Sequence, residues 1–366
     1  MTGGAIAVTD SICSYLNKFA QHGFVVVLSP QCEYIGIKIQ AYSNVKVINY
    51  YCKTSLYVVL THRNRFLDNL VVNEQIEAVF TIWEPYWNAR CPHLAGFAQP
   101  DIVYTESPYF SLISFRERVT NKIKNILKLW CIKSSTKHIY TENQGVSDRL
   151  KVLLPNCKVY TVTGYYHQIY DLPERWVEKR LPNFDGITML TIAAPYPHKN
   201  LPITIETARI LKQKYPNFKF RFIMTLTPEE LHGYDDSLKD NFVFVGRVKI
   251  EECPSLYVQS NIMWMPTLLE SFSGTYAEAM KMKTPIVTTD LGFAHGICCD
   301  AAKYFSPLSA AAAAECIYHI ASNKTVCDQL VDNGLKQLIT FNNSEERAAL
   351  LIHYLEDIAG YKRNAK

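Results

Sequence analysis

The amino-acid sequence predicts an α/β protein of two domains, each built on a doubly wound parallel sheet. Short apolar segments typical of buried strands alternate with helical segments in both halves of the chain, which is the pattern of such sheets. The 366 residues, 48% of them hydrophobic, are enough for two cores. Residues 171–186 are polar, contain two prolines and show no periodicity, so we expect them to link the domains.

The first domain is expected to span residues 1–170. Gly3 and Gly4 predict a turn, followed by a helix that reaches Ala20. Helices are also expected around residues 62–75, 112–130 and 144–153. The expected strands cover residues 24–28, 45–48, 78–82, 102–104, 138–140 and 159–162.

The second domain is expected to span residues 187–343 and to repeat the alternation. Its expected strands cover residues 189–193, 219–224, 241–245, 262–265 and 285–288. Helices are expected over residues 200–214, 251–260 and 309–322, with a further one that starts near Thr275. Residues 344–366 are expected to hold a closing helix over about 344–359.

Composition narrows the class of protein. A net charge of +4 and a pI of about 8.4 are too weakly basic to predict nucleic-acid binding. The eleven cysteines are scattered, which favours a reduced, cytoplasmic setting. We find no signal segment and no apolar run of the roughly 18 residues that a membrane span needs. Any membrane contact is therefore expected to be peripheral, on the cytoplasmic face.

One stretch, residues 261–280, carries the chemistry. Glu270 follows an apolar strand, a small-residue turn comes next, and Glu278 lies about one turn inside the following helix. Ser273 and Gly274 suit a helix start whose backbone N–H groups are open to an anion. The N–H groups from Phe272 to Thr275 can therefore bind a diphosphate, while carboxylates hold sugar hydroxyls.

This stretch resembles the retaining nucleotide-sugar glycosyltransferases of family 4 (glycosyl transferases group 1). The resemblance rests on the two glutamates eight positions apart and on four shorter segments, 197–200, 244–246, 283–287 and 300–307. It covers residues 186–310 well and the N-terminal half weakly. The resemblance implies the GT-B fold, in which two Rossmann-like doubly wound domains face a central cleft. It also implies that the closing helix crosses back to the first domain.

The resemblance also implies roles for single residues. Glu270 would bind the hydroxyls of the donor sugar, and Glu278 the ribose of the nucleotide. Lys199, with His198 beside it, would neutralise the leaving diphosphate. Many family members have an arginine five positions before this lysine, where this chain has Ala194.

Two further positions complete the candidate set. Arg247, after Gly246, can replace the missing phosphate-binding cation or lie near the base. In related enzymes an N-domain histidine lies near the reacting centre, and His93 is the loose match here, although a loop histidine with a structural role fits equally well. No Asp-x-Asp ends a strand and no Cys/His cluster has zinc spacing, so we expect no metal and no cofactor.

We therefore expect a metal-independent glycosyltransferase of polysaccharide biosynthesis. It would move a sugar, with retention, from a nucleoside-diphosphate-sugar to a glycan or lipid-linked glycan. Two alternatives remain open: a nucleotide-sugar epimerase or phosphorylase on the same fold, and a glycan-binding scaffold without activity.

Two features of the first half stay open. Residues 114–137 combine seven basic side chains with apolar ones at helical spacing, which fits either a solvated helix or one that docks on an anionic membrane. The family's first domain opens with a buried strand before a Gly-rich turn, but here Gly3 and Gly4 come at once. The first strand is therefore expected to be missing, with a shortened chain or another segment in its place.

Overall fold

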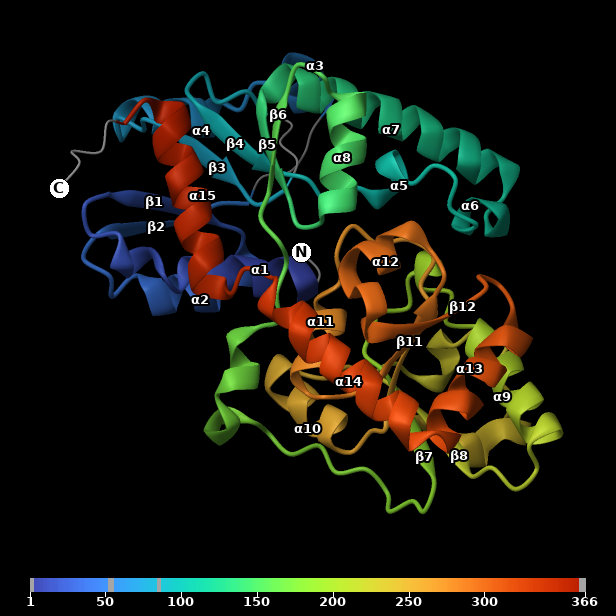
Figure 1. Ribbon diagram of the computed structural model, residues 1–366. Helices are drawn as coiled ribbons and strands as arrows, with labels where there is room; N and C mark the ends of the chain where they lie inside the picture. The colour runs from blue at the N-terminus through green and yellow to red at the C-terminus, as the bar shows by residue number, and fades with distance from the viewer. Residues whose placement is uncertain (1–2, 52–55, 84–86, 362–366) are drawn as a thin grey trace. The chain divides into compact units, whose positions relative to one another are not determined.

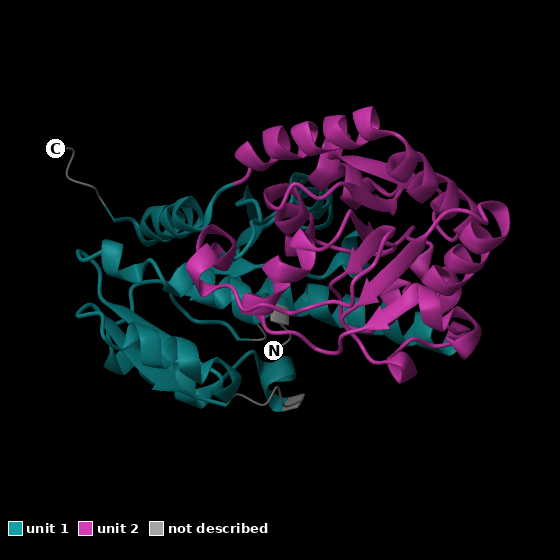
Figure 2. Cartoon of the chain, turned by 90° about the horizontal axis from the view of Figure 1, so that it is seen from below, with its two compact units in different colours: residues 1–103, 116–167, 342–366 teal, residues 104–115, 168–341 magenta. Residues whose placement is uncertain are grey.

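The computed structural model describes residues 3–51, 56–83 and 87–361. The chain divides into two compact units, shown in Figure 2. Unit 1 comprises residues 1–103, 116–167 and 342–366, and unit 2 comprises residues 104–115 and 168–341. Residues 104–115, which the sequence pattern assigns to the first domain, thus belong to the second unit. None of the helices in the described ranges is long and apolar enough to cross a membrane.

Unit 2 contains a six-stranded sheet in which every neighbouring pair is parallel. Its order is β12-β11-β10-β7-β8-β9. The strands are β7 (Ile187–Thr191), β8 (Phe220–Met224), β9 (Phe242–Phe244), β10 (Ile262–Met265), β11 (Ile286–Thr289) and β12 (Ala302–Phe305). Strands β8, β10 and β11 are buried along their whole length, because helices cover both faces of a parallel sheet. Trp264 and Phe222 lie fully buried in the core of this unit.

Helices follow the strands in alternation, as the sequence predicts (Figure 1). They are α9 (Ile203–Lys214), α10 (Cys253–Val258), α11 (Gly274–Lys281), α12 (Gly292–Cys298), α13 (Ala310–Ser322) and α14 (Lys324–Ile339). Helix α9 packs against α13, and α11 packs against α14. Helices α12 and α14 and strand β12 were not predicted from the sequence.

The six described strands of unit 1 form two separate parallel sheets. One pairs β1 (Phe24–Leu28) with β2 (Val45–Asn49). The other has the order β3-β4-β5-β6, with β3 (Val79–Thr81), β4 (His93–Gly96), β5 (His138–Thr141) and β6 (Lys158–Thr161). Gly96 is required by close packing, since a Cβ there would lie 1.9 Å from the carbonyl oxygen of Ile82.

The helices of unit 1 flank these sheets. They are α1 (Gly3–Cys13), α2 (Glu33–Ile39), α3 (Leu56–Thr61), α4 (Arg65–Asn73), α5 (Pro100–Val103), α7 (Phe115–Ser135, whose first residue belongs to unit 2), α8 (Gln144–Leu153) and α15 (Ser344–Ala359). The short α6 (Tyr109–Leu112) belongs to unit 2. The closing helix α15 packs against α1 and β4. Ile352 of α15 lies in one core cluster with residues of α1, β1 and α2.

Three sequence expectations in this unit are wrong. Residues 102–104 form no strand, because Pro100 opens a short helix, a position that suits its fixed φ angle and missing N–H. The strand lies earlier, at His93–Gly96, between β3 and β5. This segment contains small residues and lacks the apolar run that predicts a buried strand. Gly3 begins α1 and forms no turn, and this helix ends at Cys13, short of Ala20.

Candidate functional site

The order of strands in unit 2 creates a switch point between β7 and β10. The chain runs outward from β7 through β8 to β9, then returns to the other side of β7 and runs outward again through β10, β11 and β12. The crossover connections that follow β7 and β10 therefore leave in opposite directions. Open parallel sheets bind ligands in the crevice that this divergence leaves at the carboxyl ends of the strands.

Lys199 and Glu270 meet at this switch point. Lys199 lies in the loop after β7 and Glu270 in the loop after β10, and these two strands are neighbours. The Lys199 Nζ atom lies 2.5 Å from the Glu270 Oε1 atom. Their side chains are only 14% and 10% exposed, so water screens the pair weakly. Both residues were candidates on sequence grounds, and the structure brings them into contact.

Backbone and side-chain bonds hold the two loops together. The N–H of Leu268 donates to the carbonyl oxygen of His198 over 2.8 Å, and the hydroxyl of Thr267 donates to Glu270 Oε1 over 2.9 Å. The hydroxyl of Ser107 donates to the carbonyl oxygen of Leu268 over 2.7 Å. The loop that carries Glu270 is therefore fixed from both sides, so the carboxylate keeps its orientation without a ligand.

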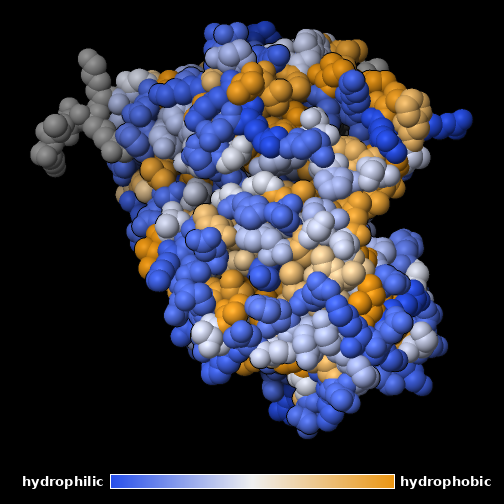
Figure 3. All heavy atoms as spheres, turned by 45° about the vertical axis from the view of Figure 1, so that its right-hand side comes forward, coloured by the Kyte–Doolittle hydropathy of each residue, from blue (hydrophilic) through white to orange (hydrophobic). Residues whose placement is uncertain are grey.

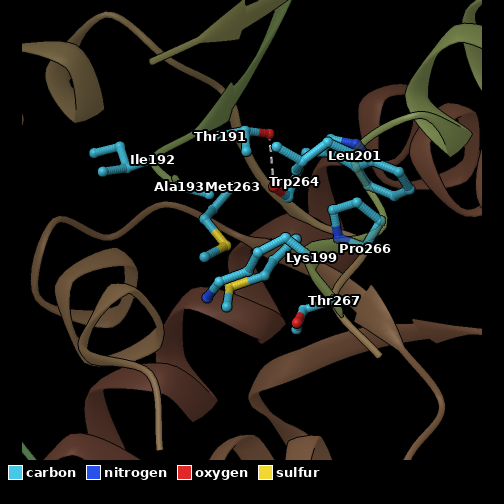
Figure 4. A pocket seen from close by; sticks show the side chains of 10 residues that line it. Thr191, Ile192, Ala193, Lys199, Leu201, Met263, Trp264, Pro266 and Thr267 are labelled. Atoms are coloured by element: carbon cyan, nitrogen blue, oxygen red, sulfur yellow. Dashed lines mark hydrogen bonds between the residues drawn. The ribbon is translucent and has the colours of Figure 1, made fainter. Parts of the chain in front are cut away.

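A small pocket opens beside this pair. Figure 4 shows that residues of β7, β10 and the loops after them line it, with Lys199 and Thr267 contributing polar ends. Inside the pocket wall, the Thr191 hydroxyl donates to the carbonyl oxygen of Trp264 over 2.9 Å, which ties the ends of β7 and β10 together. Most of the other side chains that line the pocket are apolar, so Lys199 and Glu270 lie at the edge of a largely apolar pocket.

The helix start next to Glu270 offers open donors. Helix α11 begins at Gly274, and the side chain of its N-cap Ser273 bonds the hydroxyl of Thr275 at 2.8 Å and does not cap the helix backbone. In the described part of the chain, the N–H groups of Gly274 and Thr275 have no protein acceptor. A helix N-terminus with unpaired N–H groups attracts an anion. Phe272, also a predicted donor-binding residue, instead packs its ring against Phe341.

Glu278 is buried inside α11, at 8% exposure. The Tyr257 hydroxyl donates to its Oε2 atom over 3.2 Å, and Tyr170 lies near enough for the carboxylate charge to act on its hydroxyl. Burial, and then the Glu278 charge, raise the pKa of both tyrosines well above the usual range, so both keep their protons. A carboxylate accepts about four hydrogen bonds, so a ligand hydroxyl can join these partners.

Three other predicted residues do not join the Lys199–Glu270 pair. Gly246 and Arg247 lie further along the sheet, and the ring of His198 faces another side chain. Gly246 has a φ of 66°, and Arg247 follows it with its side chain 87% exposed and Nη2 3.7 Å from Glu230 Oε1. They follow β9, which is two strand spacings, about 10 Å, from β7. The His198 ring stacks on Tyr196, while its backbone supports the Glu270 loop. The structure therefore does not unite Arg247 with Lys199.

His93 lies in unit 1, at the first residue of β4. It is therefore on a strand, at the amino edge of the sheet, where parallel sheets do not bind ligands. Its side chain is buried and its Nε2 atom bonds the Thr81 hydroxyl at 3.1 Å. Burial lowers the pKa of His93 to about 4, and the nearby backbone of Ser135 opposes this effect only weakly. This environment favours a neutral, structural histidine.

Sequence reasoning missed the residues that support the site. Ser107, Thr267, Tyr170 and Tyr257 each contact a candidate residue or its loop. Only Thr267 has a local signal, because it lies three positions before Glu270 at the end of a strand. The others come from remote segments. Among the described residues, no group of three or more His, Cys, Asp or Glu side chains is placed to hold a metal ion.

Comparison with known proteins shows what the chain is similar to. Residues 186–323 match the family model of the glycosyl transferases group 1. The O-antigen chain mannosyltransferase RfbU of Salmonella typhimurium is 26% identical over 122 residues, which cover 32% of this chain and 34% of that protein. The matched segment thus spans about a third of the length of this relative.

Solved structures resemble the whole chain. A glycosyltransferase from Rickettsia africae has a TM-score of 0.69 at 13% identity, and the match covers 98% of this chain and 96% of that one. Anabaena Alr3699/HepE, solved with UDP and glucose, has a TM-score of 0.66 at 15% identity, with 97% and 96% covered. At these identities the likeness shows the fold. The chain therefore has the GT-B fold, and its residues 186–323 are similar to the domain of the glycosyl transferases group 1.

Proposed function

We propose that the protein is a glycosyltransferase that uses a nucleoside-diphosphate-sugar. The observation that carries this proposal is the Lys199–Glu270 pair at the switch point between β7 and β10, next to the open start of α11. It places a cation, a carboxylate and unpaired N–H groups along one edge of the sheet. A sugar diphosphate needs all three.

In this proposal each group has one role. Glu270 accepts hydrogen bonds from the donor sugar, and Lys199 faces the diphosphate together with the N–H groups of Gly274 and Thr275. Glu278 binds the ribose. The bond between the anomeric carbon and the diphosphate oxygen breaks, the acceptor hydroxyl oxygen forms the new bond on the same face without a protein nucleophile, and the proton of that hydroxyl passes to the leaving diphosphate oxygen. Lys199 stabilises the negative charge that develops on the leaving diphosphate.

The acceptor in this proposal is a hydroxyl of a glycan or lipid-linked glycan in cell-surface polysaccharide synthesis, reached from the cytoplasmic side. The match to an O-antigen mannosyltransferase and the Anabaena structure with UDP and glucose support a sugar-nucleotide donor. His93 and Arg247 are left out of the reacting set, because one is buried at the amino edge of its sheet and the other lies two strands away from Lys199.

The test is a screen of purified protein against uridine and guanosine diphosphate sugars, with nucleoside diphosphate release as the readout. The variant Glu270→Gln removes the charge and keeps the shape, and it should abolish release. Glu315→Gln is the matched control, since this exposed glutamate pairs with Lys214 on the surface of the same unit. Equal activity of Glu270→Gln and the parent protein, both folded, would overturn the assignment.

The same screen separates the alternatives. An epimerase would convert the donor sugar without releasing nucleotide, and a phosphorylase would require inorganic phosphate. A scaffold without activity would bind none of the nucleotides in calorimetry. Any of these results would replace the transferase proposal.

A further inference from the structure

Helix α7, Phe115–Ser135, has its hydrophobic face turned outward. Six apolar side chains, which we call the α7 stripe, are exposed: Phe115, Val119, Ile123, Ile126, Leu127 and Trp130. At about 100° per residue they fall within an arc of roughly 120°. Ile123 is 55% exposed and Ile126 is 59% exposed. An ordinary surface helix buries such a stripe and exposes its polar face.

Polar side chains of α7 face the body of unit 1 instead. The amide of Asn125 donates to the carbonyl oxygen of Asp101 over 3.2 Å. Lys128 bonds Gln99, and its Nζ atom lies 3.8 Å from the Asp101 carboxylate. Near the end of the helix, Ile132 is buried. These contacts set the rotation of the helix and leave most of the stripe exposed, while Trp130 at its end packs partly against the His62 ring.

Basic residues border the stripe. Helix α7 has six lysines and arginines but one acidic residue, Glu117. At about 100° per residue, Lys122 and Lys124 fall on opposite sides of the stripe. Lys133 falls on the same edge of the stripe as Phe115, one turn beyond Trp130. No ion pair involves these three lysines within the described ranges. Figure 3 shows hydrophobic and hydrophilic groups side by side in the upper part of the molecule.

We propose that the α7 stripe docks the protein on the surface of an anionic phospholipid bilayer. Its apolar side chains would enter the boundary between headgroups and acyl chains, and Lys122, Lys124 and Lys133 would face lipid phosphates. A second copy of this chain fits less well, because two such faces would bring like charges together. The placement of a lipid-linked acceptor next to this surface rests on the proposed function, but the docking itself does not.

The structure also corrects which lysine matters. The sequence alone makes Lys128 equivalent to Lys122 and Lys124, but Lys128 is held by Gln99 and Asp101 on the inner side of the helix. It therefore contributes to folding of unit 1 and does not reach lipid. This difference makes a test of charge position possible within one helix.

The experiment measures flotation of the whole protein with vesicles of phosphatidylcholine alone or mixed with phosphatidylglycerol. The parent protein should float only with the anionic vesicles and should be released at high salt. Changing Lys122, Lys124 and Lys133 to Gln should weaken partitioning by about two orders of magnitude, since each basic residue contributes about fivefold. A control variant that changes Lys219, Lys324 and Lys336, all outside α7, to Gln should bind the anionic vesicles like the parent protein.

The apolar part is tested by the double variant Ile123→Ser/Ile126→Ser, with Val152→Ser and Ile339→Ser as controls at highly exposed positions on other helices. The double variant should lose vesicle binding, while the controls should not. Circular dichroism and a melting curve show that each variant is folded. Failure of the parent to bind either vesicle would overturn the proposal. So would a dimer in sedimentation that the double variant converts to monomer.

These experiments distinguish a failure of the docking proposal from a failure of the transferase proposal. Nucleotide release with a soluble acceptor, measured without vesicles, should be the same in the parent and in all α7 variants. A protein that floats with anionic vesicles but releases no nucleotide supports the docking face and contradicts the transferase proposal. Nucleotide release without flotation supports the transferase proposal and contradicts the docking face.

Discussion

Removing one partner of the Lys199–Glu270 pair tests whether the pair serves folding, chemistry or both. In the single variants Glu270→Gln and Lys199→Met, one charged side chain stays behind at a place where only about a tenth of it reaches water. Leaving a buried charge unpaired costs roughly 3 kcal/mol of unfolding free energy. For a unit of this size, that lowers the melting temperature by about 6–12 °C.

The double variant Lys199→Met/Glu270→Gln removes both charges. Neutral replacement of a buried ion pair is often close to neutral for stability, so most of the lost melting temperature should return. Activity should not return, because the donor sugar and the diphosphate have both lost their partners. The stability of all three variants is read from thermal unfolding, and the activity from nucleoside diphosphate release with the donor that the parent protein uses.

Two outcomes would refute this reasoning. If the double variant regains activity together with stability, the pair serves only folding. If the single variants melt like the parent, the pair is not buried in solution as the structure shows. Lys214→Met and Glu315→Gln provide the matched controls, because this half-exposed surface pair contributes at most about 1 kcal/mol and should lower the melting temperature by at most about 2–4 °C per variant.

Three other predictions follow from the site and its surroundings. Glu278→Gln should weaken binding of a nucleoside diphosphate in calorimetry by about one to two orders of magnitude, since one charge-assisted hydrogen bond is worth roughly 1.5–3 kcal/mol; unchanged binding would exclude the ribose role. Burial lowers the pKa of His93 to about 4, below its unfolded value of 6.5. The contribution of the neutral ring to the free energy of unfolding is therefore complete above pH 6.5 and is lost as the pH falls toward 4. His93→Gln should therefore flatten the fall of melting temperature over this range while nucleotide release at pH 7 persists; an unchanged slope would contradict the buried neutral ring. Nucleotide release should survive treatment with a metal chelator, because Lys199 and the α11 N–H groups are proposed to neutralise the diphosphate charge. If the chelator abolishes nucleotide release and added Mg²⁺ restores it, this role of Lys199 and α11 is contradicted.

The local parts of the site could be predicted from sequence. Strand β10, the turn after it and the start of α11 follow one another within some twenty residues, so the placement of Glu270 and Glu278 needs only the strand-to-helix pattern. The closing helix α15 was likewise predicted at its observed bounds, Ser344–Ala359, because Asn343 and Glu346 form a capping box and Gly360 ends the helix. Where the segments were short and rich in small residues, as at His93–Gly96, the same reasoning failed.

The sequence by itself determined the alternation of strands and helices and the carboxylates that precede and enter α11, because these depend on interactions between residues near one another in the chain. Only the tertiary structure decided that Lys199 meets Glu270, since their contact requires β10 to lie beside β7, and strand order depends on packing across the whole sheet. Only the tertiary structure decided that α7 exposes its apolar stripe. An amphipathic helix can bury either face, and here the bonds of Asn125 and Lys128 to residues 99–101 hold the polar face inward.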